Sequence, residues 1–132
     1  MIEIKSEREI NLMRNAGKIM KEIQKEVKRF IKPGISTWEL NKLIKNIIEK
    51  NGARSAEYNY PNFHKGKPAF PGHACISVNE QIIHGVPSKK VILKDRRYCN
   101  YRFSYRKRWI SCRYGKNIWS SEKMLKKVLK NY

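Results

Sequence analysis

The chain has 132 residues, 40% of them hydrophobic, and a formal net charge of +19 at pH 7; this length allows one domain with a modest core and excludes a two-domain protein. Residues 1–95 carry 18 Lys or Arg against 10 acids, whereas residues 96–132 carry 12 against one, a balance that predicts a polyanionic partner such as nucleic acid or an anionic membrane surface. Three cysteines without CxxC spacing exclude a complete disulfide framework and a paired zinc knuckle. The first residues are charged and no 18-residue apolar run follows, which excludes a secretory signal and a membrane span and indicates the cytoplasm.

A long amphipathic helix is predicted first. Residues Ser6 to Glu9 form a capping box, in which the serine hydroxyl accepts from a helical amide while the glutamate reaches back to the serine amide. Apolar residues then recur at three- and four-residue spacing until Pro33 stops the pattern. These residues are Ile10, Met13, Ala16, Gly17, Met20, Ile23, Val27 and Phe30.

A second amphipathic helix follows. Residues Ser36 to Glu39 repeat the capping box, and Asn51 with Gly52 supplies the stop. The apolar residues between these signals are Leu40, Leu43, Ile44, Ile47 and Ile48. We therefore expect two consecutive helices, each with one apolar face.

A loop and a β-hairpin are predicted next. Residues 53–72 hold three prolines and two glycines among aromatics, which is typical of an ordered, irregular loop. Residues 74–78 alternate in period two, and residues 81–84 follow the turn-capable Asn79 and Glu80. The simplest interpretation is a β-hairpin over 74–84, followed by a short apolar stretch at 91–93.

The order of these pieces carries more information than any one of them. It runs IKSEREINLMRNAGKI, KPGIST, a second helix, NGA, a loop with FPG, then CISVNEQIIHGVP. Residues 4–95 thereby resemble the amino-terminal third of the type I methionine aminopeptidases. The resemblance implies the α/β (α+β) class and an incomplete pita-bread fold, with the two helices, the hairpin and a basic irregular tail. We expect residues 1–95 to form the first part of that catalytic domain and residues 96–132 to be a tail read out of frame.

The resemblance also implies site residues. These enzymes are metalloproteases that remove the initiator methionine from nascent proteins, using two divalent metal ions (Co, Mn, Fe or Zn) that activate a bridging water. The family's histidine of HG[IV]P contacts the substrate near the scissile bond, a role that falls on His84. The family's cysteine of CISVNE lines the pocket for the methionine side chain, a role that falls on Cys75.

The same residues have plainer interpretations. By position alone, His84 ends a strand, where it can donate to a carbonyl or simply pack, and Cys75 is a small core residue. His64, His73 and Cys75 supply nitrogen and sulfur donors within twelve positions, but no fourth zinc ligand has suitable spacing. The histidines then help to shape, or merely border, the entrance to a pocket.

The metal-binding strands of the family should follow Asp95, with a pattern like GDIVTIDFG and then GYHADAA. The two aspartates of that pattern, eleven residues apart, are metal ligands, yet residues 96–121 contain no acid. Back-translated with A/T-rich codons and read one nucleotide later, residues 96–119 become EDIVTIDLVIEKDGYHADMVKTY. The aspartate codons fall across Arg102/Phe103 and Arg113/Tyr114. The hypothesis is a frameshift near codons 95 and 96, whether by pseudogene, programmed shift or sequencing error.

Several functional expectations follow for the chain as written. The family also needs a His and two Glu from beyond residue 132, so this chain, as a truncated fragment, should bind no metal and have no aminopeptidase activity. Its helices should lack a complete apolar partner, which favours aggregation or proteolysis. The alternative is a binding protein, in which the Lys, Arg and aromatic residues of 96–119 contact nucleic acid or the ribosome. A paralogue that binds nascent chains without cutting them is a third interpretation.

Overall fold

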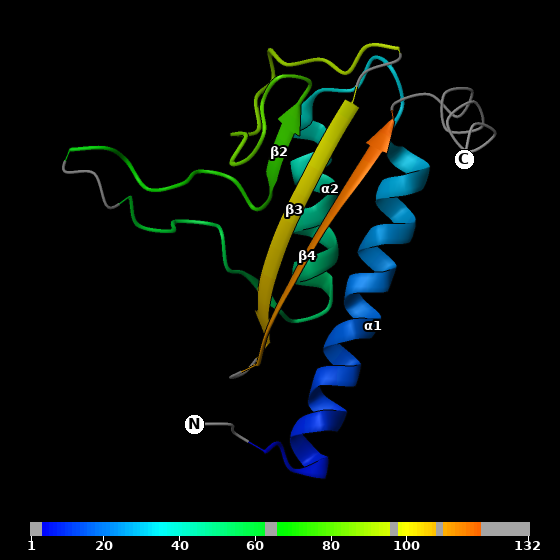
Figure 1. The fold of residues 1–132 in the computed structure, drawn as a ribbon, viewed down its shortest axis with the longest axis vertical. Helices are drawn as coiled ribbons and strands as arrows, with labels where there is room; N and C mark the ends of the chain where they lie inside the picture. Colours follow the sequence, from blue (N-terminus) through cyan, green and yellow to red (C-terminus); the bar gives the residue numbers. More distant parts are fainter. Residues whose placement is uncertain (1–3, 63–65, 96–97, 108–109, 120–132) are drawn as a thin grey trace.

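The structure is a computed structural model that describes residues 4–62, 66–95, 98–107 and 110–119 (Figure 1). Along the chain the elements are α1 (Glu7–Phe30), α2 (Thr37–Lys50), β1 (Arg54–Ser55), β2 (Cys75–Val78), β3 (Tyr98–Lys107) and β4 (Ile110–Trp119). The two helices lie together on one face of an antiparallel sheet (Figure 1). Among the described residues, no helix combines the length and apolarity that a bilayer crossing requires.

Both helices begin where the capping boxes predicted. In α1 the Ser6 amide donates to Glu9 Oε2 at 2.7 Å, and the Glu9 amide donates back to Ser6 Oγ at 3.4 Å. In α2 the corresponding distances between Ser36 and Glu39 are 2.7 and 3.2 Å. Each box satisfies amides that would otherwise lack a helical partner. The helix predictions are confirmed, although Met13, expected on the apolar face, is 49% exposed.

The predicted hairpin over 74–84 is wrong. Strand β2 pairs with β3, with Cys75 opposite Arg102 and Val78 opposite Cys99, and residues 81–84 form no strand. The reason is local: His84 has a φ of +57°, in the left-handed region that interrupts an extended strand. The backbone bonds that join this region to β2 are a turn bond, from the Gln81 amide to the Val78 carbonyl at 3.3 Å, and one from the Ile76 amide to the Gly85 carbonyl at 2.8 Å, which do not make a strand ladder.

The expectation of an irregular tail is also wrong for residues 98–107 and 110–119. Strand β3 pairs with β4 along its whole length, and with β2 and β1 along successive parts of its other edge. The strand forms because its apolar and polar residues alternate, so that Cys99, Tyr101, Phe103 and Tyr105 all face inward. Residues 120–132, whose sequence is compatible with a short amphipathic helix, fall outside the described residues.

This inward face supplies the partner that the helices were expected to lack. Tyr101, Phe103 and Tyr105 are fully buried against the helices' apolar faces, and the Tyr105 hydroxyl donates to the Ala16 carbonyl of α1. The fully buried apolar residues of the helices are Ile23, Val27, Leu40, Ile44 and Ile48. Burial of each large apolar side chain contributes about 1.5–3 kcal/mol relative to leaving it in water. The helix faces are therefore covered within the described part of the chain.

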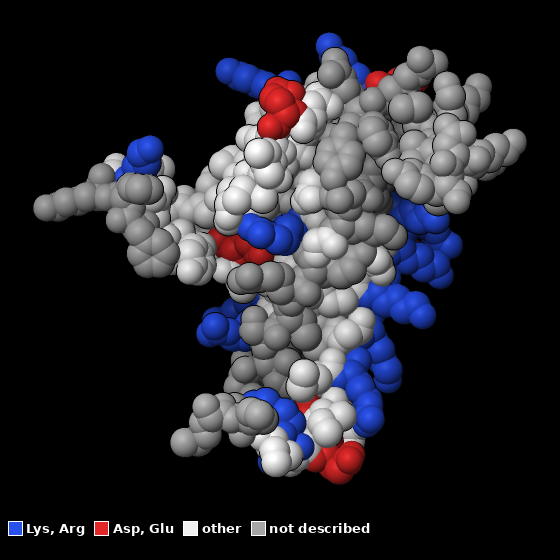
Figure 2. Space-filling view, in the orientation of Figure 1, with Lys and Arg blue, Asp and Glu red and all other residues white. Residues whose placement is uncertain are grey.

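Charged side chains are kept outside this core. Figure 2 shows Lys and Arg side chains along the outer side of the molecule, where α1 lies.

The segment 88–93 runs along the start of α2 and is bonded to it through the backbone. There the Gly34 amide donates to the Leu93 carbonyl and the Leu93 amide donates to the Ile35 carbonyl, both at 2.8 Å. This arrangement leaves the sheet face opposite the helices for the functional site.

Candidate functional site

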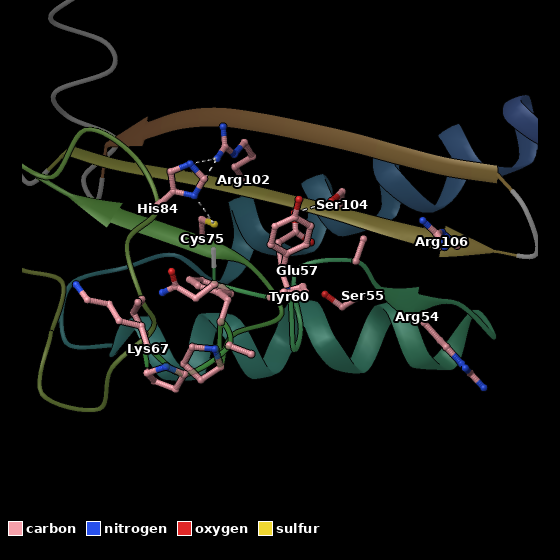
Figure 3. Close-up of a pocket in the computed structure, with 18 of the residues that line it drawn as sticks. Arg54, Ser55, Glu57, Tyr60, Lys67, Cys75, His84, Arg102, Ser104 and Arg106 are labelled. Carbon is pink, nitrogen blue, oxygen red and sulfur yellow. Dashed lines mark hydrogen bonds between the residues drawn. The ribbon is translucent and has the colours of Figure 1, made fainter. Parts of the chain in front are cut away.

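A cavity of about 1620 Å³ lies against the sheet face that points away from the helices. Alternate residues of β3, namely Arg102, Ser104 and Arg106, form one wall. Further lining residues come from β1, the start of β2, the loop between these two strands, and the segment after β2 that contains His84 (Figure 3). Because alternate residues of a strand share a face, the same alternation that buries the aromatic side chains directs these polar ones into the cavity.

Hydrogen bonds within the loop between β1 and β2, and from this loop to β3, hold it over the cavity. The Asn59 amide donates to the Phe70 carbonyl at 2.9 Å and the Phe70 amide donates to the Tyr60 carbonyl at 3.0 Å, so the two arms of the loop pair with each other. At the sheet, the Ser104 hydroxyl donates to Glu57 Oε1 at 2.6 Å. These contacts fix the described part of the loop beside β3.

Cys75 and His84, the two residues singled out from the sequence, meet in this cavity. Cys75 is the first residue of β2 and its Sγ lies 3.9 Å from His84 Nδ1. His84 reaches this point because the backbone of Gly85 packs against β2, where its amide donates to Ser77 Oγ at 3.0 Å. A Cβ atom at Gly85 would lie 2.1 Å from the Ile76 carbonyl oxygen, so only glycine fits.

Arg102 also belongs to the site, although it was not predicted from the sequence as a pocket residue. Its Nη2 lies 3.1 Å from His84 Nε2 and 3.3 Å from His84 Nδ1, and it donates to whichever ring nitrogen carries no proton (Figure 3). The alternation of residues 98–107 is the signal that would have placed Arg102 on the face opposite the buried aromatics.

His73 does not join this cluster. His73 stacks on Tyr58, with ring centroids 4.5 Å apart and planes 4° from parallel. Burial, with a smaller contribution from Lys45, lowers the pKa of His73 against an opposing effect of Glu49. His64, considered with His73 and Cys75 as a zinc ligand, falls outside the described residues. Within the described ranges no three His, Cys, Asp or Glu side chains gather as a metal site would require.

A buried side-chain amide, which was not predictable from the sequence, connects the site to the helices. Asn41 of α2 is 1% exposed, and its Oδ1 accepts from the His73 amide at 2.7 Å and from the Ala74 amide at 3.2 Å. It thereby ties the chain just before Cys75 to the core. On the helix it appeared as one more polar residue among lysines, so only the tertiary contact reveals it.

The burial of three aromatic residues in the basic stretch 96–119 argues against the nucleic-acid interpretation. Tyr101, Phe103 and Tyr105 are 0% exposed and belong to the core. Stacking on unpaired bases requires an accessible ring face. These three rings are therefore not available to a nucleic acid in this structure.

Comparisons of the sequence and of the structure with known proteins point to the same group of metallopeptidases. Residues 11–112 match the model of metallopeptidase family M24. The chain is 45% identical over 95 residues to methionine aminopeptidase 1 of Bacillus subtilis, covering 72% of this chain and 35% of that protein. It is 47% identical over 87 residues to the methionine aminopeptidase of Clostridium perfringens, covering 66% of this chain and 32% of that protein.

Solved structures resemble the whole described fold. Methionine aminopeptidase from Rickettsia prowazekii matches with a TM-score of 0.80 at 27% identity, over 96% of this chain and 49% of that one. The Thermotoga maritima enzyme matches with a TM-score of 0.78 at 24% identity, over 98% of this chain and 50% of that one, and this second likeness concerns the fold alone. The pita-bread expectation is thereby confirmed. The chain spans about a third of the length of the curated relatives that it matches.

Proposed function

Since the chain belongs to metallopeptidase family M24, we propose that residues 4–95 form the amino-terminal part of a methionine-aminopeptidase-like catalytic domain, whose substrate is the amino terminus of nascent proteins. The observation that carries this proposal is the meeting of Cys75 with His84 at one cavity, in a chain 45% identical over 95 residues to a methionine aminopeptidase. The activity of the whole enzyme, removal of the initiator methionine, is proposed for the domain of which these residues are a part.

In this proposal Cys75 lines the pocket for the methionine side chain and His84 contacts the peptide near the scissile bond. Cys75 is 5% exposed and lies on β2 beneath the cavity, where a thiol offers a small, polarisable surface to a thioether. His84 is exposed above it and offers ring nitrogens to the peptide. An apolar floor and a polar rim suit a methionine residue with its amide bond.

This division of roles is tested with peptides that differ only at the first residue. Met-Ala-Ser should bind the 132-residue chain more tightly than Ala-Ala-Ser, as followed by NMR titration, and His84→Asn should weaken Met-Ala-Ser at least tenfold. Asparagine suits this variant because it tolerates the left-handed backbone of position 84. Lys18→Gln, an exposed change on α1, serves as control. Equal binding of the two peptides would remove the proposed methionine pocket.

The described residues do not fit the metal pair that the family implies. Such a pair would supply a Lewis acid and a water of lowered pKa, and it requires carboxylate and imidazole ligands. Here the Arg102 guanidinium, a cation, occupies the space beside His84. We therefore propose that this polypeptide, as written, does not hydrolyse peptides. Turnover of Met-Ala-Ser with added Co²⁺ or Mn²⁺, abolished by His84→Asn, would overturn this.

We further propose that residues 96–119 are the family's metal-bearing strands read in the wrong frame. In the neighbouring frame, counted from residue 96, the aspartates of the family's two motifs fall at positions 102 and 113. Since Arg102 pairs with Gly115 and Ser104 pairs with Arg113, positions 102 and 113 share one face on neighbouring strands, about 7 Å apart diagonally. That separation suits two carboxylates that hold a pair of cations. This register supports the frameshift hypothesis, in which residue 95 is the last residue of the in-frame segment.

The nucleotide sequence across codons 90–120 tests the frame directly. It should spell a peptide close to EDIVTIDLVIEKDGYHADMVKTY one nucleotide later. CGN-type arginine codons there, without such a peptide, would exclude the hypothesis. The substrate-binding proposal for Cys75 and His84 does not depend on this result.

A further inference from the structure

One end of the cavity carries two arginines that the binding of a methionine residue does not use. Arg54 of β1 and Arg106 of β3 are direct partners in the antiparallel register, both line the cavity, and both are exposed. Within the described part of the chain, no ion pair joins either arginine to an acid. Like charges at directly opposed positions destabilise a sheet, so a negatively charged group bound beside the pair would offset that repulsion.

This pair lies away from His84 along β3. Arg106 is four residues from Arg102, the arginine that contacts His84, so the two ends of the wall are about 13 Å apart along the strand. Figure 3 shows Arg102 toward one end of the cavity and Arg106 toward the other. Lys67, the lysine of the lining, also lies away from the pair (Figure 3).

The stretch between the two ends carries an acid. Ser104 lies midway between Arg102 and Arg106 on the same face of β3, and its hydroxyl donates to Glu57 Oε1 at 2.6 Å. Glu57 is the acid among the lining residues. Counted from His84, the wall therefore presents a negative group first and two positive groups beyond it.

An extended peptide on this wall advances at the same rate as β3. Both rise about 3.3 Å per residue, and in both the side chains alternate between two faces. In the proposed binding mode the side chain of the first residue lies on Cys75 and the bond after it lies at His84. The side chains of the third and fifth residues then return to the wall. The third lies beside Glu57, and the fifth lies beside Arg54 and Arg106.

We propose that Arg54 and Arg106 form a subsite for an acidic residue at the fifth position of the bound peptide. The preferred ligands are then amino termini that begin with methionine and carry aspartate or glutamate four residues later. This inference rests on the proposed function, because the methionine pocket sets the register of the peptide. Guanidinium groups hold a carboxylate through paired N–H donors, whereas a carboxylate at the third position faces Glu57 and is repelled.

The test compares two peptides of identical composition. Both have seven residues, begin with methionine and end in an amide, with aspartate at the fifth position of one, at the third position of the other, and serine elsewhere. Because they are isomers, the attraction exerted by the net charge of +19 is the same for both.

The fifth-position peptide should bind the full 132-residue chain about three- to tenfold more tightly, as followed by NMR titration at low salt. With lysine in place of aspartate, the order of the two affinities should reverse. Equal affinities of the aspartate isomers, or an unreversed order for lysine, overturn the proposal.

Variants assign the preference to the two arginines. Arg54→Gln combined with Arg106→Gln should reduce the ratio of the two affinities at least twofold, whereas Arg8→Gln, an exposed change on α1, should leave it unchanged. Partial loss of the folded state lowers both affinities by the same factor, so the ratio reports the subsite even in a destabilised variant. A ratio that survives the double change overturns the proposal.

Replacing the first methionine by alanine in both isomers separates this subsite from the methionine pocket. An effect of the first residue without a difference between the isomers overturns the subsite alone. A difference between the isomers without an effect of the first residue overturns the methionine pocket, and the arginines then remain a site for acidic peptides.

Discussion

Asn41 offers the sharpest test of how the helices position the site. Its Oδ1 accepts two backbone hydrogen bonds, from His73 at 2.7 Å and Ala74 at 3.2 Å, at a residue that is 1% exposed. Asn41→Leu keeps the size of the side chain but removes the acceptor. Both amides then lose their partner, and each buried unsatisfied group costs about 1–3 kcal/mol. Partial relaxation of the loop before β2 reduces the total, so we expect a loss of about 2–4 kcal/mol.

Urea unfolding followed by far-UV circular dichroism measures this loss. With an m-value of about 2 kcal/mol per molar urea, the unfolding midpoint should fall by about 1–2 M while m stays unchanged. Asn46→Leu is the matched control, since Asn46 lies on the same helix and is exposed, and surface changes of this kind stay within about 0.5 kcal/mol. Equal midpoints for the two variants would refute the assignment of Asn41 as the tie between α2 and the site.

Three further outcomes are expected. The side-chain and backbone hydrogen bonds of Ser36 lower the pKa of Glu39 in the folded state. The ionised Glu39 carboxylate therefore stabilises the fold above its unfolded-state pKa, and this stabilisation is lost as the pH falls through its folded-state pKa. Glu39→Gln should accordingly flatten the acid side of a plot of thermal midpoint against pH. Burial raises the pKa of Cys99 to about 12, so mass spectrometry should find it unlabelled by iodoacetamide in the native chain at pH 8 and labelled in urea. Gly85→Ala, which brings a Cβ to 2.1 Å from a β2 carbonyl, should lower the thermal midpoint, whereas Gly17→Ala, with nothing within 4 Å, should raise stability by about 0.5–1 kcal/mol. A stable Gly85→Ala protein would contradict the close packing described at His84.

Local signals and tertiary ones differed in what they predicted. The helix starts at Ser6 and Ser36 were predictable because a capping box is complete within four residues. The partner of β2 was not, because CISV is compatible with any strand that presents a matching edge, and the nearest candidate, residues 81–84, is interrupted at His84. The alternation of residues 98–107 was present in the sequence, but the density of arginines favoured an interpretation by charge over one by period.

That alternation also bears on how a slipped frame can still yield a folded sheet. The middle base of each codon in the neighbouring frame is the third base of a codon in this one. On the A/T-rich codons of the hypothesis, Cys99, Tyr101, Phe103 and Tyr105 all end in T, and codons with T in the middle encode apolar residues. The neighbouring frame therefore places valine, isoleucine, leucine and isoleucine at positions 99, 101, 103 and 105.

These are the positions that the structure buries against α1 and α2. Position 102 lies on the opposite face, and on the codons of the hypothesis it is aspartate in the neighbouring frame and arginine in this chain. Because a strand buries every second residue, a change of frame with this codon usage conserves the face that packs the core. Under the frameshift hypothesis, the same change alters the opposite face of the strand, where Arg102 lies beside His84.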